Sequence, residues 1–441
     1  MRDRAGPIAV VALTTALVLG LRIGPAWVRG PDYFRWPHAP LDELALLGLL
    51  LPAALVAWAV HRGRADGRAA TACCAAAALL ALIEGWLRHG GPPLAGAAAL
   101  LEDDGIHGYL STARDVCPRP DWLATYPSVM PHQGIHVRVH PPGPVATYCV
   151  VFAFTGAGSG ATIGAAAALG LAAASTPLWA QRLATRLGAG PRAAVIAAGL
   201  CALAPAPAAF FPSFDAVYPA LTTATLLVWA VALDRGSHRW AAGAGALVWV
   251  LSSASYVLGV ILVPLVALAG SVTTDAARRR RMATTAGIAL VSLVVLAWAA
   301  TGFDPFAVFA TALDDQAGNL ASSFRDRAWH ETVGWDLWDF AQGLPMIVAI
   351  PALALAWRGL RTDDPIARRL ASMALAGPLL AALSGALTTE TFRTWMFLMP
   401  PVFVAAGREL ASWPPRHLAV FLACAAVLSA TWLQQLRFVW S

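Results

Sequence analysis

The sequence predicts an all-α membrane protein, a polytopic bundle of about 12–14 transmembrane helices with two long extracytoplasmic loops. Of its 441 residues, 58% are hydrophobic and only 13% are charged, whereas soluble domains average about 45–50% apolar residues. The mean hydropathy is +0.62. The apolar residues also gather in stretches of about 20, which is the length that crosses a bilayer as a helix. We therefore expect one integral membrane domain over residues 1–441.

The apolar stretches place the expected helices along the chain. The first carries Arg22 and has no clear small-residue cleavage site, so we interpret it as a retained helix and not as a signal peptide. The expected spans are 7–28, 43–60, 69–87, 143–158, 161–180, 193–211, 218–234, 240–252, 255–270, 283–301, 343–358, 369–387, 395–411 and 417–435. The two long polar segments between them are residues 88–142 and 302–342.

The arginines predict the orientation of these helices. All 31 basic residues are arginine, and they concentrate in the short loops 61–68, 234–239, 277–282 and 358–369. Short basic loops face the cytoplasm, so we expect both long loops to lie on the outer face of the plasma membrane. The net charge of +6 follows from these loops, and it indicates no nucleic-acid partner.

One segment conflicts with this orientation. Two full spans between 143 and 180 would place Arg182, Arg186 and Arg192 on the outer face, against the positive-inside rule. Either one of the two stretches is a partial or re-entrant helix, or these arginines face outward and bind an anionic group. The sequence leaves both alternatives open.

The first long loop opens with an unusual group of acids. The stretch LEDDGIHGYLSTARDV (101–116) places three consecutive carboxylates after a run of alanine and leucine. Unpaired carboxylates cost several kcal/mol to bury, so these acids are solvated, paired or functional. One alternative is a solvated helix cap at the membrane surface. The other is that Asp103 or Asp104 serves as a general base that accepts the proton of an acceptor hydroxyl.

The same loop carries a family resemblance. Its acidic pair, Tyr109, the Ala113–Arg114 pair and the later segment HVRVHPPGPVATY (136–148) resemble the C-fold (GT-C) glycosyltransferases. That superfamily includes protein O-mannosyltransferases, aminoarabinose transferases and actinobacterial mannosyl- and arabinofuranosyltransferases. Its members take a sugar from a polyprenyl phosphate and transfer it to an acceptor at the outer face. The resemblance implies that Asp104 or Asp103 is catalytic, with Asp104 preferred.

Two further stretches extend the resemblance. FFPSFDAVYPAL (210–221) places Asp215 in a short outer turn, where family members carry a second acid near the lipid phosphate. ETFRTWMFLMPP (390–401) places Glu390 and Arg393 at the outer start of a late helix. A guanidinium offers a planar fork of donors to phosphate oxygens, so we expect Arg393 to contact the phosphate.

Arg138, His140 and Tyr109 complete the expected binding residues. His140 directly precedes Pro141 and Pro142, which suit the first turn of the next helix. It is expected to contact the lipid phosphate or to orient an acid.

The second long loop is rich in aromatic residues and acids. Trp329, Trp335 and Trp338 predict either an interfacial amphipathic helix, which we favour, or a surface on which a sugar stacks. Asp314 and Asp315 form a second acidic pair and are the alternative catalytic carboxylates.

The histidines and cysteines indicate no metal centre. The loop holds His107, His132, His136 and His140, but no HExxH motif or cysteine partner accompanies them. Five of the six cysteines lie in apolar stretches and only Cys117 lies in a polar loop, so we expect no disulfide framework. No cofactor is firmly implied, and participation of a divalent metal stays open.

These observations favour an inverting glycosyltransferase that uses a polyprenyl-phosphate sugar and modifies a hydroxyl of a cell-envelope glycan or protein. The alternative from another class is a transporter or a flippase for lipid-linked sugars. It would place ionisable residues at helix centres or in broken helices, whereas most acids here fall in outer loops. A non-catalytic membrane scaffold would not require a long loop rich in acids and histidines.

Overall fold

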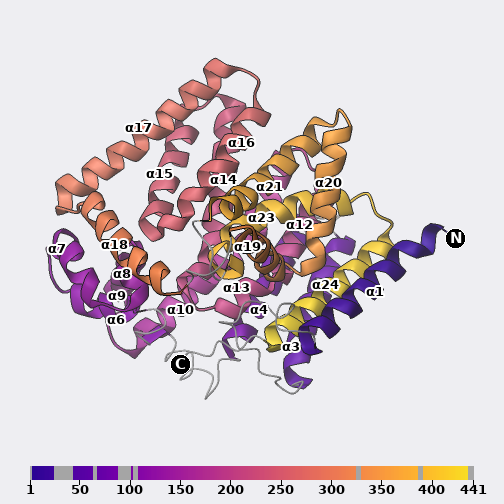
Figure 1. The fold of residues 1–441 in the computed structure, drawn as a ribbon, viewed down its shortest axis with the longest axis horizontal. Helices are drawn as coiled ribbons and strands as arrows, with labels where there is room; N and C mark the ends of the chain where they lie inside the picture. Colours follow the sequence, from indigo (N-terminus) through magenta and orange to yellow (C-terminus); the bar gives the residue numbers. More distant parts are fainter. Residues whose placement is uncertain are drawn as a thin grey trace.

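The structure, a computed structural model, describes residues 2–23, 43–62, 67–87, 101–102, 108–323, 329–385 and 391–435. In these ranges it is all-α, and no strand is present. This confirms the predicted fold class. Figure 1 shows the helices as one bundle, in which α14, α15, α16 and α17 form the upper left part and α1 lies against α24 at the right.

The helices follow one another in the order shown in Figure 1. Their bounds are α1 Arg2–Ile23, α3 Glu43–Arg62, α4 Gly67–Leu87, α6 Tyr109–Val116, α7 Trp122–Val129, α8 Ile135–Val139, α9 Gly143–Thr155, α10 Ser159–Ala174, α11 Thr176–Arg186, α12 Pro191–Leu203, α13 Pro205–Phe210, α14 Tyr218–Arg235, α15 His238–Ala254, α16 Leu262–Val272, α17 Ala276–Thr301, α18 Pro305–Ser323, α19 Trp329–Gly343, α20 Ala349–Arg361, α21 Pro365–Ser384, α22 Thr391–Thr394, α23 Met399–Leu410 and α24 Pro415–Gln435. Short 3₁₀ helices include η2 (Phe214–Val217), η3 (Tyr256–Ile261) and η5 (Met396–Leu398).

Fewer helices are long enough to cross a membrane than the sequence predicts. In the described ranges eight helical stretches are long and apolar enough, or nine if the bent pair of α19 with the helices that end at Arg361 forms one span. That pair bends by 107°. Extended backbone at Ala204 divides the predicted span 193–211 into α12 and α13. Extended backbone at Ser255 ends α15 close to the expected boundary between the spans 240–252 and 255–270. The chain is thus a multi-pass membrane protein with several short or interrupted helices.

The segment between 143 and 186 contains one full span and one partial helix. Helices α10 and α11 together form a continuous span, Ser159–Arg186, whereas α9 has 13 residues. At 1.5 Å per residue, α9 is about 20 Å long and too short for a hydrocarbon core of about 30 Å. The turn after α9 lies beside the first long loop, because the Arg114 side chain donates a hydrogen bond to the Ala157 carbonyl oxygen at 3.3 Å.

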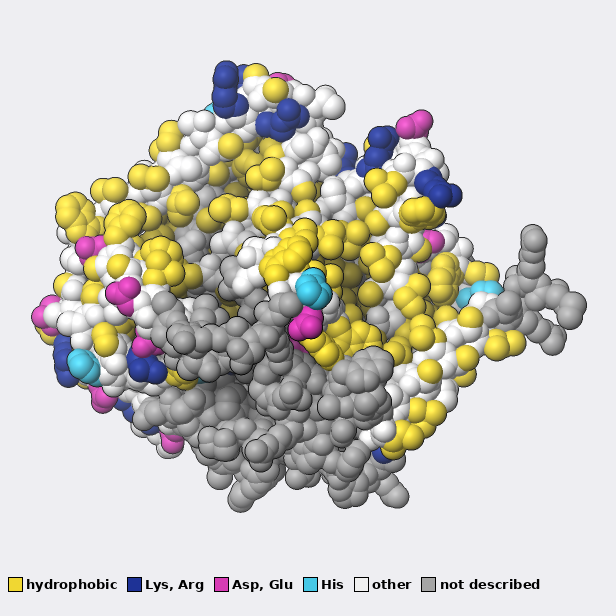
Figure 2. All heavy atoms as spheres, viewed as in Figure 1, with side chains coloured by type: hydrophobic (Ala, Val, Ile, Leu, Met, Phe, Trp, Pro, Cys, Tyr) yellow, Lys and Arg dark blue, Asp and Glu magenta, His cyan; other side chains and the backbone are white. Residues whose placement is uncertain are grey.

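The arginines that conflicted with the predicted orientation lie at the opposite end of that span. Arg186 forms an ion pair with Asp234 in one of the basic loops. Arg192 donates hydrogen bonds to the carbonyl oxygens of Ala411 and Trp413, at 2.9 and 3.0 Å. The structure therefore supports the partial-helix alternative. Arginine side chains also gather at the top of Figure 2, over the start of α17, and at its upper right, beside the turn between α20 and α21.

The centre of the bundle is built from small side chains. In the span Pro191–Phe210, which contains α12 and α13, 94% of the apolar window is buried. Glycines allow the surrounding helices to approach closely. A Cβ atom at Gly407 on α23 would lie 2.6 Å from the carbonyl oxygen of Ala193 on α12. This contact fixes α23 against α12.

We expect Gly245→Ala to destabilise the protein by about 1–3 kcal/mol, because an added methyl group overpacks a close helix contact. A Cβ atom at Gly245 on α15 would lie 2.1 Å from the carbonyl oxygen of Ala286 on α17. Gly243→Ala is the matched control, since the nearest atom to its Cβ is a Val228 methyl at 3.6 Å. Thermal unfolding in detergent measures both variants. Equal melting temperatures for the two would contradict this account of the α15–α17 contact.

Candidate active site

The structure brings together four of the residues predicted to form the site. Asp215, Arg393, Tyr109 and His140 come from four segments that are far apart in the sequence and lie within electrostatic range of one another. Three predicted residues, Asp103, Asp104 and Glu390, lie outside the described residues.

Asp215 and Arg393 form an ion pair at the centre of this group. Asp215 lies in η2, the turn between α13 and α14, and Arg393 lies in α22. Arg393 Nη1 and Asp215 Oδ2 are 3.8 Å apart, and the two side chains are 12% and 22% exposed. The guanidinium also lies over the Phe210 ring, 5.8 Å from its centroid. An aromatic face attracts a cation, so the ring and the carboxylate together hold the guanidinium in a largely buried position.

Tyr109 and His140 form the side of the group that comes from the first long loop. Their rings meet edge to face with centroids 6.0 Å apart. Tyr109 is the first residue of α6 and follows Gly108, whose φ of 63° suits glycine. Burial raises the pKa of the Tyr109 hydroxyl well above its usual value, and the charge of Asp215 adds to the shift. The hydroxyl therefore stays protonated and can donate a hydrogen bond to an anion.

His140 is held as a neutral imidazole. Burial lowers its pKa to about 4, and the nearby charge of Arg393 acts in the same direction. Its Nδ1 lies 2.8 Å from the His136 carbonyl oxygen. A carbonyl oxygen only accepts, so Nδ1 carries the proton and Nε2 is left as an acceptor.

This protonation state predicts a pH dependence of stability. The pKa of His140 is lower in the folded protein than its usual 6.5, so the unfolded chain binds the proton more readily as the pH falls. The contribution to the free energy of unfolding is present above pH 6.5 and is lost as the pH falls towards 4. We expect the melting temperature of wild type to fall more than that of His140→Gln between pH 7 and pH 4.5. Parallel decreases would contradict the assignment.

Arg138 contacts a different part of the outer surface. Its Nη1 lies 3.5 Å from Asp315 Oδ1, so the residue joins α8 to α18. This ion pair links the two long loops, which also pack together through α7, α8 and α18. Asp314 is exposed. Arg138 is thus placed at the junction between the loops, whereas His140, two residues later, lies in the group around Arg393.

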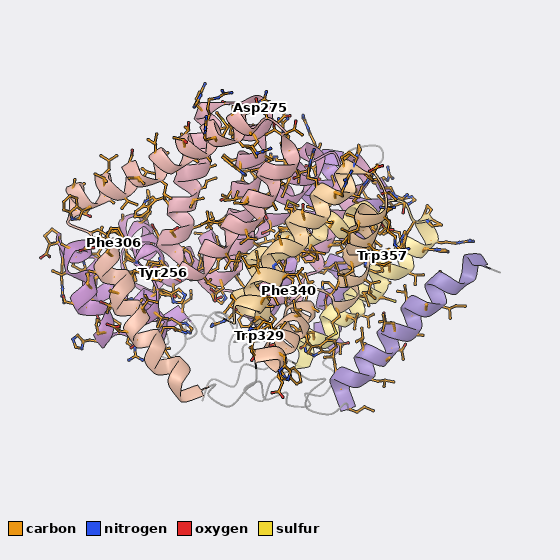
Figure 3. All side chains as sticks on the ribbon, turned by 45° about the horizontal axis from the view of Figure 1, so that its top comes forward. Tyr256, Asp275, Phe306, Trp329, Phe340 and Trp357 are labelled. Carbon is orange, nitrogen blue, oxygen red and sulfur yellow. A yellow bond between two sulfur atoms is a disulfide. The ribbon has the colours of Figure 1, made fainter. Side chains whose placement is uncertain are left out.

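Buried acids on α19 are a feature that the sequence prediction missed. Asp336 and Asp339 are each 2% exposed, and the Thr391 hydroxyl of α22 donates to the Asp336 carbonyl oxygen at 2.7 Å. Trp329, in contrast, is 56% exposed and lies at the opposite end of the molecule from Asp275 in Figure 3. The two acids are three residues apart and therefore lie on one helix face. The sequence prediction for this segment rests on its tryptophans and not on that spacing. Helix α19 thus buries both acidic side chains and exposes its first tryptophan.

Tyr218 is a second residue that the prediction missed. It is the first residue of α14, three residues after Asp215, and its hydroxyl donates to the Ala254 carbonyl oxygen at 3.3 Å. It lies within electrostatic range of Asp215 and Arg393. The sequence could have pointed to Tyr218, because it lies in the stretch 210–221 that also carries Asp215.

An apolar pocket lies below the turn that carries Asp215. Its cavity volume is only about 20 Å³, and it lies between α4, the α10–α11 span, α12–α13, α14 and α23. Its lining includes Ala78, Ala173, Ala208, Pro219 and Phe403. Ala208 and Pro219 belong to the helices on either side of η2, so the pocket adjoins the Asp215 segment.

The expectation of no disulfide is wrong. Cys117 and Cys149 are joined by a disulfide, with their Cα atoms 5.6 Å apart. Cys149 was placed in a membrane span, but α9 is a partial helix that packs against α6, and this brings the two cysteines together. Among the described side chains, no group of three or more His, Cys, Asp or Glu could hold a metal ion, and His107 lies outside the described residues.

Comparison with known proteins shows a likeness at the level of the fold. No family model matches the chain, and no curated protein matches it. Among solved structures, it is similar to the crystal structure of the Archaeoglobus fulgidus oligosaccharyltransferase tethered by a disulfide bond to an acceptor peptide that contains the NVT sequon. The TM-score is 0.52 and the identity 14%. The match covers 82% of this chain and 55% of that one, so this chain spans about half the length of the neighbour.

At this identity the likeness concerns the fold alone, and it agrees with the polytopic helical architecture that the sequence predicts.

Proposed function

We propose that this chain is a glycosyltransferase that takes a sugar from a polyprenyl phosphate and transfers it, with inversion, to a hydroxyl acceptor at the outer face of the plasma membrane. The observation that carries the proposal is the convergence of Arg393, Asp215, Tyr109 and His140. These groups suit a phosphate leaving group, and they lie in a fold similar to that of an oligosaccharyltransferase. The acceptor would be a glycan or protein of the cell envelope.

In the proposed reaction, Asp104 or Asp103 accepts the proton of the acceptor hydroxyl as its oxygen attacks the anomeric carbon. The bond to the polyprenyl phosphate breaks, and negative charge develops on the phosphate oxygens. Arg393 stabilises that charge, and the protonated Tyr109 hydroxyl donates a hydrogen bond to it. Phosphate is a good leaving group, so one base suffices.

His140 and Asp215 have supporting roles in this scheme. Since Nδ1 of His140 donates to His136, the acceptor Nε2 suits a hydrogen bond from a hydroxyl better than contact with an ionised phosphate. Asp215 orients the Arg393 guanidinium through their ion pair.

The outward orientation of the site rests on two independent features. The arginines at the ends of α11 and α12 lie with the other basic loops, away from Tyr109 and His140. The Cys117–Cys149 disulfide belongs to the loop side, and disulfides persist in oxidising extracytoplasmic compartments.

Cysteine labelling on intact cells tests this orientation. We expect a membrane-impermeant maleimide to label Ser128→Cys, on α7, but not Ser412→Cys, in the turn between α23 and α24, until the cells are permeabilised. Both serines are exposed, and both hydroxyls bond only to a carbonyl oxygen of their own helix. Wild type measures background labelling of the native cysteines. The reverse labelling pattern would contradict the orientation.

The proposed activity is tested with purified protein in nanodiscs and a panel of polyprenyl-phosphate hexoses and pentoses. We expect release of free polyprenyl phosphate that depends on both the protein and an acceptor. A transporter or flippase would instead move the intact donor between leaflets of a proteoliposome without releasing polyprenyl phosphate. That result would exclude the transferase and support the transport alternative.

A further inference from the structure

A disulfide and the contacts of Arg114 hold α6, which carries Tyr109, against α9, which follows the segment of His140. Helix α6 begins at Tyr109, and Cys117 follows its last residue. Helix α9 begins at Gly143, three residues after His140, and carries Cys149 in its second turn. The Cys117–Cys149 disulfide therefore joins the far end of α6 to α9. We call the Cys117–Cys149 disulfide and the contacts of Arg114 the α6–α9 clamp.

Arg114 supplies the second connection of the clamp. Its Nη2 donates to Glu102 Oε1 at 2.7 Å, and its Nε donates to the Ala157 carbonyl oxygen after α9. The Thr162 hydroxyl of α10 donates to the same Glu102 oxygen at 3.0 Å. The hydrogen bond from Arg114 lowers the pKa of the Glu102 carboxyl. Glu102, the first of the three consecutive acids, is thus a structural anchor.

The disulfide contributes more to this arrangement than the ion pair. The Arg114 and Glu102 side chains are about one third exposed, and exposed ion pairs contribute little. The disulfide is a covalent link that holds the Cα atoms of Cys117 and Cys149 5.6 Å apart, and disulfide geometry allows this distance only a narrow range.

Helix α9 itself is fixed to the bundle at its first residue. A Cβ atom at Gly143 would lie 2.1 Å from the Ser253 carbonyl oxygen of α15. This contact leaves no space for α9 to shift towards α15. The disulfide consequently fixes α6 to a helix whose own position is determined by the bundle.

We propose that the Cys117–Cys149 disulfide is a positioning element of the active site, which holds Tyr109 beside Arg393 so that the lipid phosphate is bound. The inference rests on the proposed function. In the reduced protein, Tyr109 on α6 is tied to the bundle only by non-covalent contacts, and the hydrogen-bond donor it offers to the phosphate is no longer fixed. The oxidised protein therefore binds polyprenyl phosphate more tightly than the reduced protein.

The test compares polyprenyl-phosphate binding and donor kinetics of oxidised and reduced protein in nanodiscs. Dithiothreitol supplies two electrons and two protons, the S–S bond breaks to give two thiols, and the reagent closes to a cyclic disulfide. We expect reduction to raise Kd and the donor KM about tenfold, with a smaller change in kcat. The reason is that the hydrogen bond from the Tyr109 hydroxyl to the charged phosphate is weakened. Reoxidation with oxidised glutathione is expected to restore both constants.

Two variants complete the design. Cys117→Ser/Cys149→Ser is expected to show the weak binding of the reduced protein and no response to dithiothreitol. Cys73→Ala, which removes a free cysteine on α4, is expected to behave as wild type. Where the double variant fails to fold, the comparison rests on reduced wild type, whose fold is checked by size-exclusion chromatography and tryptophan fluorescence.

Equal Kd and KM in folded oxidised and reduced protein would overturn the inference and leave the proposed function intact. A fall in melting temperature without a change in these constants would also overturn it, since it indicates a purely structural bridge. Failure of the oxidised protein to bind any polyprenyl phosphate would overturn the proposed function and the inference with it.

Discussion

Replacing Arg393 with alanine is expected to lower kcat/KM for transfer from a polyprenyl-phosphate sugar by about 10²–10³-fold, the usual effect of removing a group that stabilises developing charge. The guanidinium is largely buried and lies between the Asp215 carboxylate and the Phe210 ring. Without it, the departing phosphate meets the uncompensated carboxylate of Asp215. Steady-state kinetics with a fixed acceptor measures the loss.

Two further variants separate charge from geometry at this position. Arg393→Lys keeps the positive charge but not the planar fork, so we expect an intermediate activity. Asp215→Asn in the Arg393→Ala background removes the uncompensated charge and should recover part of the loss. The control is Arg280→Ala, an exposed arginine at the basic end of α17. Wild-type kinetics in Arg393→Ala would mean that the lipid phosphate is bound elsewhere.

Substitution of the catalytic base is expected to have the other large effect. One of Asp103→Asn and Asp104→Asn should lower kcat by about 10²–10⁴-fold, the contribution of general acid–base catalysis. Asp104 is the preferred base from the family resemblance. The donor KM should change little, because the base acts on the acceptor. Single-turnover release of polyprenyl phosphate measures the chemical step.

Asp115→Asn is the matched control for these two variants. Asp115 is an exposed residue of α6, so the substitution makes the same change in charge and size close to the same loop. Full activity in both Asp103→Asn and Asp104→Asn would exclude the proposed base. The Asp314–Asp315 pair would not simply replace it, since Asp315 is engaged with Arg138.

The convergence of Asp215 with Arg393 could be predicted from their positions before two expected spans. Asp215 directly precedes the span 218–234 and Arg393 directly precedes the span 395–411, and both of these spans begin on the same predicted side of the membrane. Charged residues at the outer ends of apolar stretches are easy to recognise in a chain with 13% charged residues. The placement of Tyr109 and His140 followed from the family resemblance. Their protonation states depend on burial and on Arg393, which the sequence does not reveal.

The number of full spans could not be predicted for a physical reason. Hydropathy measures the free energy of transferring residues to the bilayer, and a 13-residue partial helix such as α9 is as apolar as part of a longer one. The disulfide escaped prediction for the same reason, because Cys149 was assigned to the membrane when α9 was taken as a span.

The acids of α19 illustrate a different limit. Asp336 and Asp339 lie in the second long loop, where the sequence predicts an interfacial helix, but the structure buries both side chains. The direction in which a helix face points depends on tertiary packing, which helical periodicity alone does not specify.

The almost complete enclosure of α12 has a consequence for how this chain tolerates sequence change. Its segment PRAAVIAAGLCAL contains no aromatic side chain, and its neighbours approach it closely enough that Gly199 faces Val56 at 2.7 Å from an added Cβ. The close approach of the neighbouring helices therefore limits the volume of the side chains on α12 more than their polarity. Homologous sequences should interchange alanine, glycine, serine and cysteine here, while positions of α17 that face away from α15 should accept apolar side chains of varied volume.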